Sequence, residues 1–225
     1  MPLSKIEQQY SIIEMLTTEA IKTSEIEGEF LSREDVRSSI INGLGLGIGK
    51  RLVSNKRATG ISKLMVHLRE TFSAPLTKDT LLTWHQLLME GSLGINAGAW
   101  RASTAPMRIV SGPIGNEQVH FEAPPSSRIP DEMDRFFVWF EKTAPNQPEA
   151  IEQPLIRAAI AHLFFESIHP FEDGNGRIGR AISEKAIAQF FGRPLLMSLS
   201  KTISKNRKAY HEALKKGQRS NEITD

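Results

Sequence analysis

HPFEDGNGRIGR, residues 169–180, joins the two segments of this chain with the clearest helical patterns. Before it, apolar residues form two neighbouring rows at i, i+4 spacing, one through Leu155, Ala159 and Leu163 and the other through Ile156, Ile160, Phe164 and Ile168. Two adjacent rows make a wide apolar stripe, which predicts a central, buried helix over about 152–168. A second apolar pattern follows the stretch and ends at Gly192, a typical C-terminal stop. The sequence therefore predicts a helix–loop–helix unit at the centre of the fold.

The rest of the chain is also mostly helical in pattern. Apolar spacing and capping residues predict further helices over about 5–26, 32–43, 54–72, 77–90 and 202–216, and one that starts near Asp131. The runs MRIV (107–110) and QVHF (118–121) flank SGPIGNE and predict a β-hairpin. The proline-rich run 123–130 is expected to be extended. We therefore predict an all-α fold with one small hairpin, in which residues 1–45 form N-terminal helices and residues 46–225 form a single core.

Composition excludes several classes of protein. The chain has 225 residues, of which 40% are hydrophobic and 24% charged, as in ordinary globular proteins. It has no cysteine, which excludes disulfides and thiolate metal sites. No apolar run is long enough to span a membrane, and acids and glutamines stand where a secretory signal would be apolar. The net charge of +2 is small for a nucleic-acid binder. We therefore expect a cytoplasmic globular protein without membrane contact.

Several groups within residues 169–180 indicate a site that binds a polyphosphate. The turn Gly174–Gly176 leads straight into a helix, where free backbone N–H groups and the helix dipole favour an anion. Arg177 and Arg180 lie on the first turn of that helix, although the dipole disfavours cations there, and such a conflict is typical of a functional site. Asp173 is a candidate ligand for a hard cation such as Mg²⁺, and His169 is a candidate general base. Each feature alone is common in structural roles, but their clustering favours a site.

The stretch resembles the signature of Fic-domain proteins, HxFx(D/E)GNGRxxR, at every specified position. The resemblance extends upstream through AGAWR (97–101), the predicted hairpin and VHFEAPP (119–125), so it covers most of the chain. Members of this family mostly transfer AMP from ATP to a hydroxyl of a target protein, with release of pyrophosphate. The resemblance implies a Fic-type helical core with the hairpin as a flap, ATP as the substrate and Mg²⁺ as the cofactor.

The resemblance also implies a role for each residue of the motif. His169 would deprotonate the attacking Tyr, Ser or Thr hydroxyl, and Asp173 would bind Mg²⁺. The phosphates would contact backbone and cationic groups of the loop and the following helix: Gly174, Asn175, Gly176, Arg177 and Arg180. The flap residues Ile109, Val110 and Val119 would align the target segment by strand addition.

Gly176 separates branches of the family, because kinase-like members carry lysine at this position. It therefore favours nucleotidyl transfer, although it does not settle ATP against another nucleotide. Tyr210 and Asn206 are candidates for the nucleoside end of the site, and surface or core roles stay open for both.

The first predicted helix ends in TSEIEG (23–28), which resembles the family's inhibitory pattern (S/T)xxxE(G/N). Thr23, Glu27 and Gly28 stand in the specified places. A glutamate delivered to the anion site would pair with Arg180 and occupy the space of the γ-phosphate. The same letters also suit an ordinary helix end that stops at glycine. The position of the pattern N-terminal to a complete motif favours the inhibitory role, and indicates the class with an N-terminal inhibitory helix.

Together these features predict an autoinhibited, Mg²⁺-dependent protein adenylyltransferase whose partner is a protein hydroxyl, its own chain included. Two alternatives stay open: removal of AMP by the same site, and a nucleotide-sensing module of a DNA-associated protein. Longer relatives continue into further helices and often a winged-helix domain, so nucleic acid would be reached only through such a missing C-terminal domain. The target and the oligomeric state are left open by the sequence.

Overall fold

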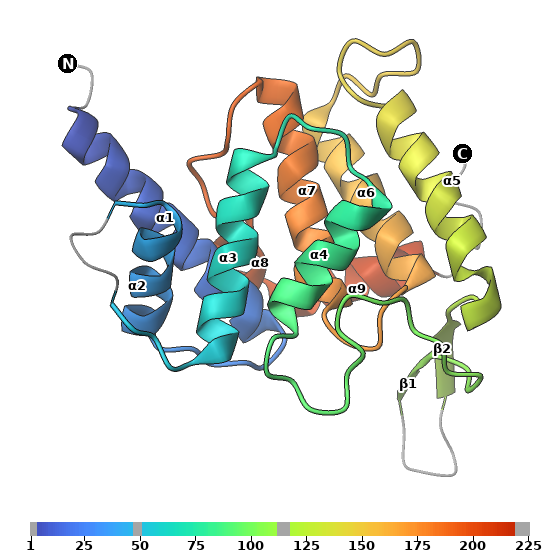
Figure 1. Cartoon of the computed structure of the whole chain (residues 1–225). Coiled ribbons are helices and arrows are strands. Elements are labelled where there is room, and N and C mark those ends of the chain that lie inside the picture. Colours follow the sequence, from blue (N-terminus) through green and yellow to red (C-terminus); the bar gives the residue numbers. More distant parts are fainter. Residues whose placement is uncertain (1–3, 47–50, 112–117, 219–225) are drawn as a thin grey trace.

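The computed structural model describes residues 4–46, 51–111 and 118–218 (Figure 1). Within them the elements follow in this order: α1 (Lys5–Ile26), α2 (Arg33–Gly43), α3 (Lys56–Glu70), α4 (Lys78–Leu88), β1 (Arg108–Ser111), β2 (Gln118–Glu122), the 3₁₀ turn η1 (Ser126–Arg128), α5 (Ile129–Lys142), α6 (Pro154–Ile168), α7 (Asn175–Phe191), α8 (Leu199–Lys205) and α9 (Arg207–Gly217). Figure 1 places the hairpin on one side of the helices and α1 and α2 on the opposite side. The predicted all-α fold with one small hairpin is therefore confirmed. No helix of the described part is long and apolar enough to cross a membrane.

α7 is the central helix of the fold. It packs against α1, α3, α4, α6 and α8, and every residue from Arg177 to Ala188 is buried. The helices around it contribute large buried side chains, among them Leu64 of α3, Trp84 of α4 and Phe165 of α6. Its first turn follows directly on the motif loop, so the candidate site residues lie at the end of a helix whose position is fixed by packing on several sides.

α6 lies beside α7 but turns a different face inward than the apolar rows predict. Leu155 and Ile156, one from each row, are 69% and 50% exposed. The buried face carries Arg157, Ala158, Ala161, His162, Phe165, Glu166 and Ile168. Arg157 is held there because its guanidinium donates to the backbone carbonyls of Phe140, at 2.7 Å, and Ala186, at 3.3 Å. The predicted wide buried stripe was wrong over the first turns, because α6 is apolar on nearly all sides and its neighbours decide which side is covered.

The N-terminal helices are tied to the C-terminal part of the chain. α1 packs against α2, α3 and α8. The buried Glu19 on α1 accepts hydrogen bonds from the backbone N–H of Ser200, at 3.0 Å, and from the hydroxyl of Ser198, at 2.6 Å. Both groups lie at the start of α8, where the helix dipole favours a carboxylate. This tie helps to hold α1 so that its C-terminal end, at Glu27, lies beside the start of α7.

Two boundaries differ from the sequence prediction. The helix expected over 202–216 is in fact two helices, α8 and α9, which meet at Asn206. The run expected to be extended over 123–130 contains η1. α5 then begins at Ile129 with Pro130 in its first turn, where a proline forfeits no helical hydrogen bond.

β1 and β2 confirm the predicted hairpin. The strands pair antiparallel, with Val110 opposite Val119 and an irregular register between Ile109 and Val110. The predicted turn, residues 112–117, lies outside the described residues. The base of the hairpin is tied to the motif, because Arg101 donates both to the carbonyl of Pro124 and, at 2.7 Å, to the carbonyl of His169.

Candidate active site

The motif loop has a shape that its own sequence enforces. Gly174 has φ of 83°, and a Cβ there would lie 2.7 Å from Cε of Met89 and 3.0 Å from Cδ2 of Leu88. Both the backbone angle and the space therefore require glycine. The buried Asn175 side chain spans the loop, since its Oδ1 accepts from the N–H of Phe171 at 3.0 Å and its Nδ2 donates to the carbonyl of Phe171 at 2.9 Å. The loop is thus fixed before any ligand binds.

Phe171 anchors the loop in the core. Its buried ring stacks on His85 of α4 with centroids 4.0 Å apart, and it also packs against Trp100. Burial lowers the pKa of His85 to about 4, so the ring is neutral at physiological pH. Its Nδ1 accepts a hydrogen bond from the N–H of Gly98 at 2.9 Å. His85 is therefore a buried structural residue under the loop, in keeping with its position in an amphipathic helix.

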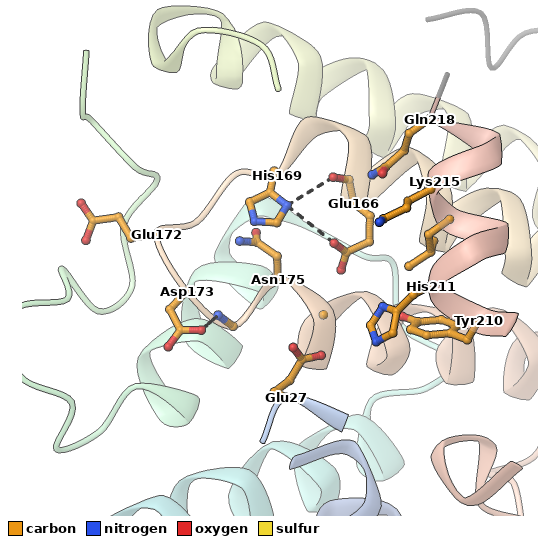
Figure 2. A pocket seen from close by; sticks show the side chains of 13 residues that line it. Glu27, Glu166, His169, Glu172, Asp173, Asn175, Tyr210, His211, Lys215 and Gln218 are labelled. Atoms are coloured by element: carbon orange, nitrogen blue, oxygen red, sulfur yellow. Dashed lines mark hydrogen bonds and ion pairs between the residues drawn. The ribbon is translucent and has the colours of Figure 1, made fainter. Parts of the chain in front are cut away.

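His169 ends α6 in a left-handed conformation, with φ of 50° and ψ of 60°. Its backbone is held from both sides, because its N–H donates to the carbonyl of Phe165 at 3.0 Å and its carbonyl accepts from Arg101. Nδ1 of its ring lies 3.3 Å from the backbone carbonyl of Glu166 and 3.6 Å from Oε2 of the same residue (Figure 2). Burial lowers the pKa of His169, so that the imidazole is neutral at physiological pH, as a general base must be.

Asp173 of the loop pairs with Arg177 of α7. Oδ1 of Asp173 accepts from the N–H of Gly174 at 2.5 Å and from Arg177 at 3.2 Å. The buried Arg177 also donates at 2.7 Å to Glu29, whose second oxygen pairs with Arg57 of α3 at 3.2 Å. Glu29 follows the predicted inhibitory pattern by one residue and was not anticipated from the sequence, because nothing local to it indicates an arginine so distant in the chain.

Arg180 is fully buried and receives the end of α1. Its Nε donates to Oγ1 of Thr23 at 2.8 Å and its Nη2 donates to the carbonyl of Thr23 at 2.9 Å. Nη2 also lies 2.8 Å from Oε1 of Glu27. The same carboxylate oxygen lies only 2.2 Å from the place where a Cβ of Gly176 would stand. The pattern TSEIEG therefore brings its glutamate into contact with Arg180 of the motif.

The motif loop and the end of α1 face one cavity of about 490 Å³ (Figure 2). Its walls come from the end of α1, the end of α6, the motif loop and α9, and its lining includes Glu27, His169, Asp173, Gly174, Asn175 and Gly176. Six residues of the lining were not predicted: Glu166, Glu172, His211, Leu214, Lys215 and Gln218. Glu166 could have been found from its i, i+3 spacing to His169, whereas the α9 residues arrive through tertiary packing alone. Arg177 and Arg180 lie behind this lining.

Tyr210 and Asn206, the two candidates for contacting the nucleoside, differ in position. Tyr210 of α9 lines the cavity, and its hydroxyl lies 2.6 Å from Nε2 of His162 and 3.4 Å from Nη1 of Arg180. Burial raises the pKa of Tyr210 to about 12, so its hydroxyl stays protonated. Asn206 is exposed at the junction of α8 and α9 and does not line the cavity. The flap residues Ile109, Val110 and Val119 lie on the paired strands.

Asp173 fits a magnesium ion that shares its ligands with a substrate. Its side chain is 57% exposed, and Oδ2 has no hydrogen-bond partner among the described residues. The described ranges contain no group of three or more acidic or histidine side chains that could hold a metal. Mg²⁺ is commonly held by one or two carboxylates together with substrate phosphates. A single carboxylate beside an anion-binding loop suits that mode of binding.

Comparison with known proteins matches two parts of the chain. Residues 75–186 match the Fic/DOC family, and residues 2–46 match a domain of unknown function, DUF4172. The chain is 22% identical over 184 residues to a protein adenylyltransferase Fic of Nematostella vectensis, and the match covers 80% of this chain but 39% of that protein. The chain thus spans well under half the length of this curated relative.

Solved structures show the same architecture. A Fic family protein from Desulfovibrio desulfuricans is 27% identical with a TM-score of 0.62, covering 94% of this chain and 58% of its own. A signalling protein with a Fic domain from Bacteroides thetaiotaomicron is 18% identical with a TM-score of 0.71, covering 99% of this chain and 82% of its own. At that identity the second likeness concerns the fold alone.

Proposed function

This chain belongs to the Fic/DOC family, and on that basis we propose that it is a protein adenylyltransferase held inactive by the end of its own first helix. A target hydroxyl, from Tyr, Ser or Thr, attacks the α-phosphorus of ATP. The new bond joins that oxygen to phosphorus, the bond to the β-phosphate oxygen breaks, and pyrophosphate leaves. The observation that carries this proposal is the convergence of a neutral, partly exposed histidine and a preformed anion-binding loop on one cavity.

His169 takes the proton of the attacking hydroxyl in this proposal. Because its Nδ1 faces the backbone carbonyl of Glu166, the ring proton belongs on Nδ1 and the lone pair of Nε2 stays free for the substrate. The backbone N–H groups at the start of α7 and the side chains of Arg177 and Arg180 bind and orient the phosphates. Positioning and charge compensation of this kind supply most of the rate in phosphoryl chemistry.

Asp173 would hold Mg²⁺, which supplies positive charge to the phosphates when it is bound. The residue is already beside the loop, since its Oδ1 accepts from the N–H of Gly174. Replacing it by asparagine keeps the shape but removes the anion, so transfer should fall and recover only partly at high Mg²⁺.

The contact of Glu27 with Arg180 supports the inhibitory part of the proposal. The carboxylate holds the guanidinium that would receive a terminal phosphate, and its oxygen covers Gly176. A triphosphate placed on the same loop would meet both the volume and the negative charge of Glu27. ATP in its productive position and the end of α1 in its present position are therefore mutually exclusive in this proposal.

Covalent labelling tests the proposed reaction. The purified chain is incubated with Mg²⁺ and ATP that is radioactive at the α-phosphate, alone and with cell lysate, and in parallel with ATP labelled at the γ-phosphate. Label should be incorporated from the α-position only, into protein. His169→Ala should lower incorporation by about 10²–10⁴-fold while ATP binding is retained. ATP binding without any transfer would instead identify a nucleotide-sensing module, and label from the γ-position would identify a kinase.

A further inference from the structure

Glu166 is a buried carboxylate that the reaction described above does not use. It lies three residues before His169 on α6 and is 8% exposed. Its Oε2 lies 3.6 Å from Nδ1 of His169, and the backbone carbonyl oxygen of Glu166 lies 3.3 Å from the same nitrogen (Figure 2). Its other oxygen, Oε1, is buried with no hydrogen-bond partner among the described residues. Burying a carboxylate costs free energy unless it is matched by charge or hydrogen bonds, so an incompletely matched one at the edge of a reactive site needs an explanation.

Charged groups from several elements face this pair. Glu166 is near Arg180 of α7 and Glu27 at the end of α1. His169 is near Arg101, Glu27 and Asp173. His162 and Glu166 both lie over Gly179. A Cβ at Gly179 would lie 2.8 Å from Nδ1 of His162 and 3.1 Å from Oε1 of Glu166. Burial raises the pKa of Glu166 to about 7 and lowers the pKa of His169. Because Oε2 of Glu166 and Nδ1 of His169 lie 3.6 Å apart, each group's titration depends on the other's charge.

We propose that Glu166 is a positioning residue whose carboxylate stabilises the imidazolium that forms when His169 takes the proton of the target hydroxyl. This inference rests on the proposed function. In the resting state the backbone carbonyl of Glu166 is the nearer acceptor, and it keeps Nε2 unprotonated. Once Nε2 gains the proton, the ring carries a positive charge 3.6 Å from Oε2. An ionised carboxylate at that distance favours the charged ring and hence the transition state that leads to it.

Kinetics of Glu166→Gln test the effect on the reaction. Glutamine keeps the shape of the side chain and removes its charge. The comparison is made in chains that also carry Glu27→Gly, so that the proposed inhibition does not mask the result. We expect kcat to fall by about 10- to 100-fold, a fraction of the 10²–10⁴-fold that a general base contributes. KM for ATP should stay unchanged, because Glu166 acts on the base and not on the phosphates.

Titration of His169 followed by NMR gives a second readout that needs no activity. Removing an ionised neighbour should lower the pKa of His169 in Glu166→Gln. Glu166→Asp, which keeps the charge on a shorter side chain, should give an intermediate value. Glu172→Gln is the matched control, since Glu172 lines the same cavity but points away from His169 (Figure 2). It should shift the pKa of His169 by less.

The two readouts separate the inference from the proposed function. If the pKa of His169 is the same in Glu166→Gln as in the parent, the inference is overturned, even if transfer is lost, because the residue then has only a structural role. Unchanged kcat with a shifted pKa also overturns it. A parent chain that transfers no AMP, while the pKa of His169 still falls in Glu166→Gln, refutes the proposed function and leaves the pairing of the two side chains supported.

Discussion

Arg180 is fully buried, yet most of its hydrogen bonds do not depend on Glu27. Thr23 accepts two of them, through its hydroxyl and its carbonyl, and Tyr210 accepts a third at 3.4 Å. The side chain of Glu27 is 35% exposed, so solvent screens its attraction to the guanidinium. Losing this ion pair should therefore cost no more than about 1 kcal/mol of stability. The pair is better suited to control access to the site than to hold the fold together.

Glu27→Gly should raise transfer activity. The substitution frees Arg180 for a phosphate and clears the space over Gly176. We expect incorporation of label from ATP to rise by at least about tenfold, which corresponds to ~1.4 kcal/mol of preference for the inhibited arrangement. The measurement is the rate of labelling of the chain itself and of lysate proteins, with excess Mg²⁺ and with ATP well below the concentration that saturates the parent.

Glu25→Gly is the control for this prediction. It removes another acid from the same end of α1, but Glu25 pairs with Lys22 and does not reach the motif. It should leave the rate unchanged. The double variant Glu27→Gly with Arg180→Ala should lose the gain, because the released arginine is its cause. If Glu27→Gly labels no faster than the parent, TSEIEG is only a helix end.

At the scale of the elements, the tie between α1 and α8 depends on one buried carboxylate. Glu19 is 2% exposed and accepts from Ser198 and from both the backbone and the hydroxyl of Ser200. Glu19→Ala should lower the free energy of unfolding by about 1–3 kcal/mol, because three donors at the start of α8 lose their acceptor. Urea unfolding followed by circular dichroism measures the loss.

Glu14→Ala is a matched substitution on the same helix. Glu14 pairs with Arg33 and Arg37 on the surface, where ion pairs contribute little. Its effect should stay below about 0.5 kcal/mol. Equal losses at the two positions would mean that α1 is held by its apolar face alone, and that Glu19 has no special role.

Elements that local chemistry defines could be predicted from the sequence. Ser32 and Thr77 cap α2 and α4 as expected, and Gly192 ends α7. The break at Asn206 has no such signal, because neither glycine nor proline occurs near it. The buried face of α6 was also out of reach: Leu155 is more apolar than Arg157, but only Arg157 can satisfy the carbonyls that α5 and α7 present to it.

In the candidate site, too, the residues set by local sequence could be predicted, and those brought in by helix packing could not. Its motif could be predicted because Asn175 closes the loop onto Phe171, only four residues away. Glu29 and Tyr210 reach the same site from positions 148 and 30 residues distant from their arginine partners. Such contacts depend on how whole helices pack. The amino-acid pattern around Glu29 contains no record of that packing, and Tyr210 was named from the sequence only as a candidate for the nucleoside end.

At the scale of the whole molecule, two buried histidines make stability depend on pH. Burial lowers the pKa of both His85 and His162 to about 4, from an ordinary value of 6.5. Above pH 6.5 neither the folded nor the unfolded chain is protonated at these rings. Between pH 6.5 and 4 the unfolded chain takes up protons that the folded chain excludes, so this part of the stability is lost as pH falls. Glu166 opposes it, because a raised pKa makes the folded chain bind its proton more tightly than the unfolded chain does.

His85→Phe isolates one of these contributions. Phenylalanine retains the stacking on Phe171 but loses the hydrogen bond from Gly98, so the variant should be slightly less stable at pH 8. As pH falls from 6 to 4, the parent should lose stability relative to the variant by up to about 1.4 kcal/mol per pH unit. Urea unfolding of both chains at pH 8, 6 and 5 measures this difference. A difference that is the same at every pH would mean that His85 takes up its proton at the same pH in the folded and in the unfolded chain.

The carboxylate that covers Gly176 is attached to the protein it inhibits, and this has a consequence for regulation. A separate inhibitor binds less as its concentration falls. A tethered competitor keeps the same effective concentration at any protein concentration. On the proposed function, occupancy of the site is then set by free ATP alone. Each 1.4 kcal/mol in favour of the covered arrangement raises the apparent Kd for ATP by about tenfold. One glutamate would thus fix the nucleotide concentration at which the chain begins to act.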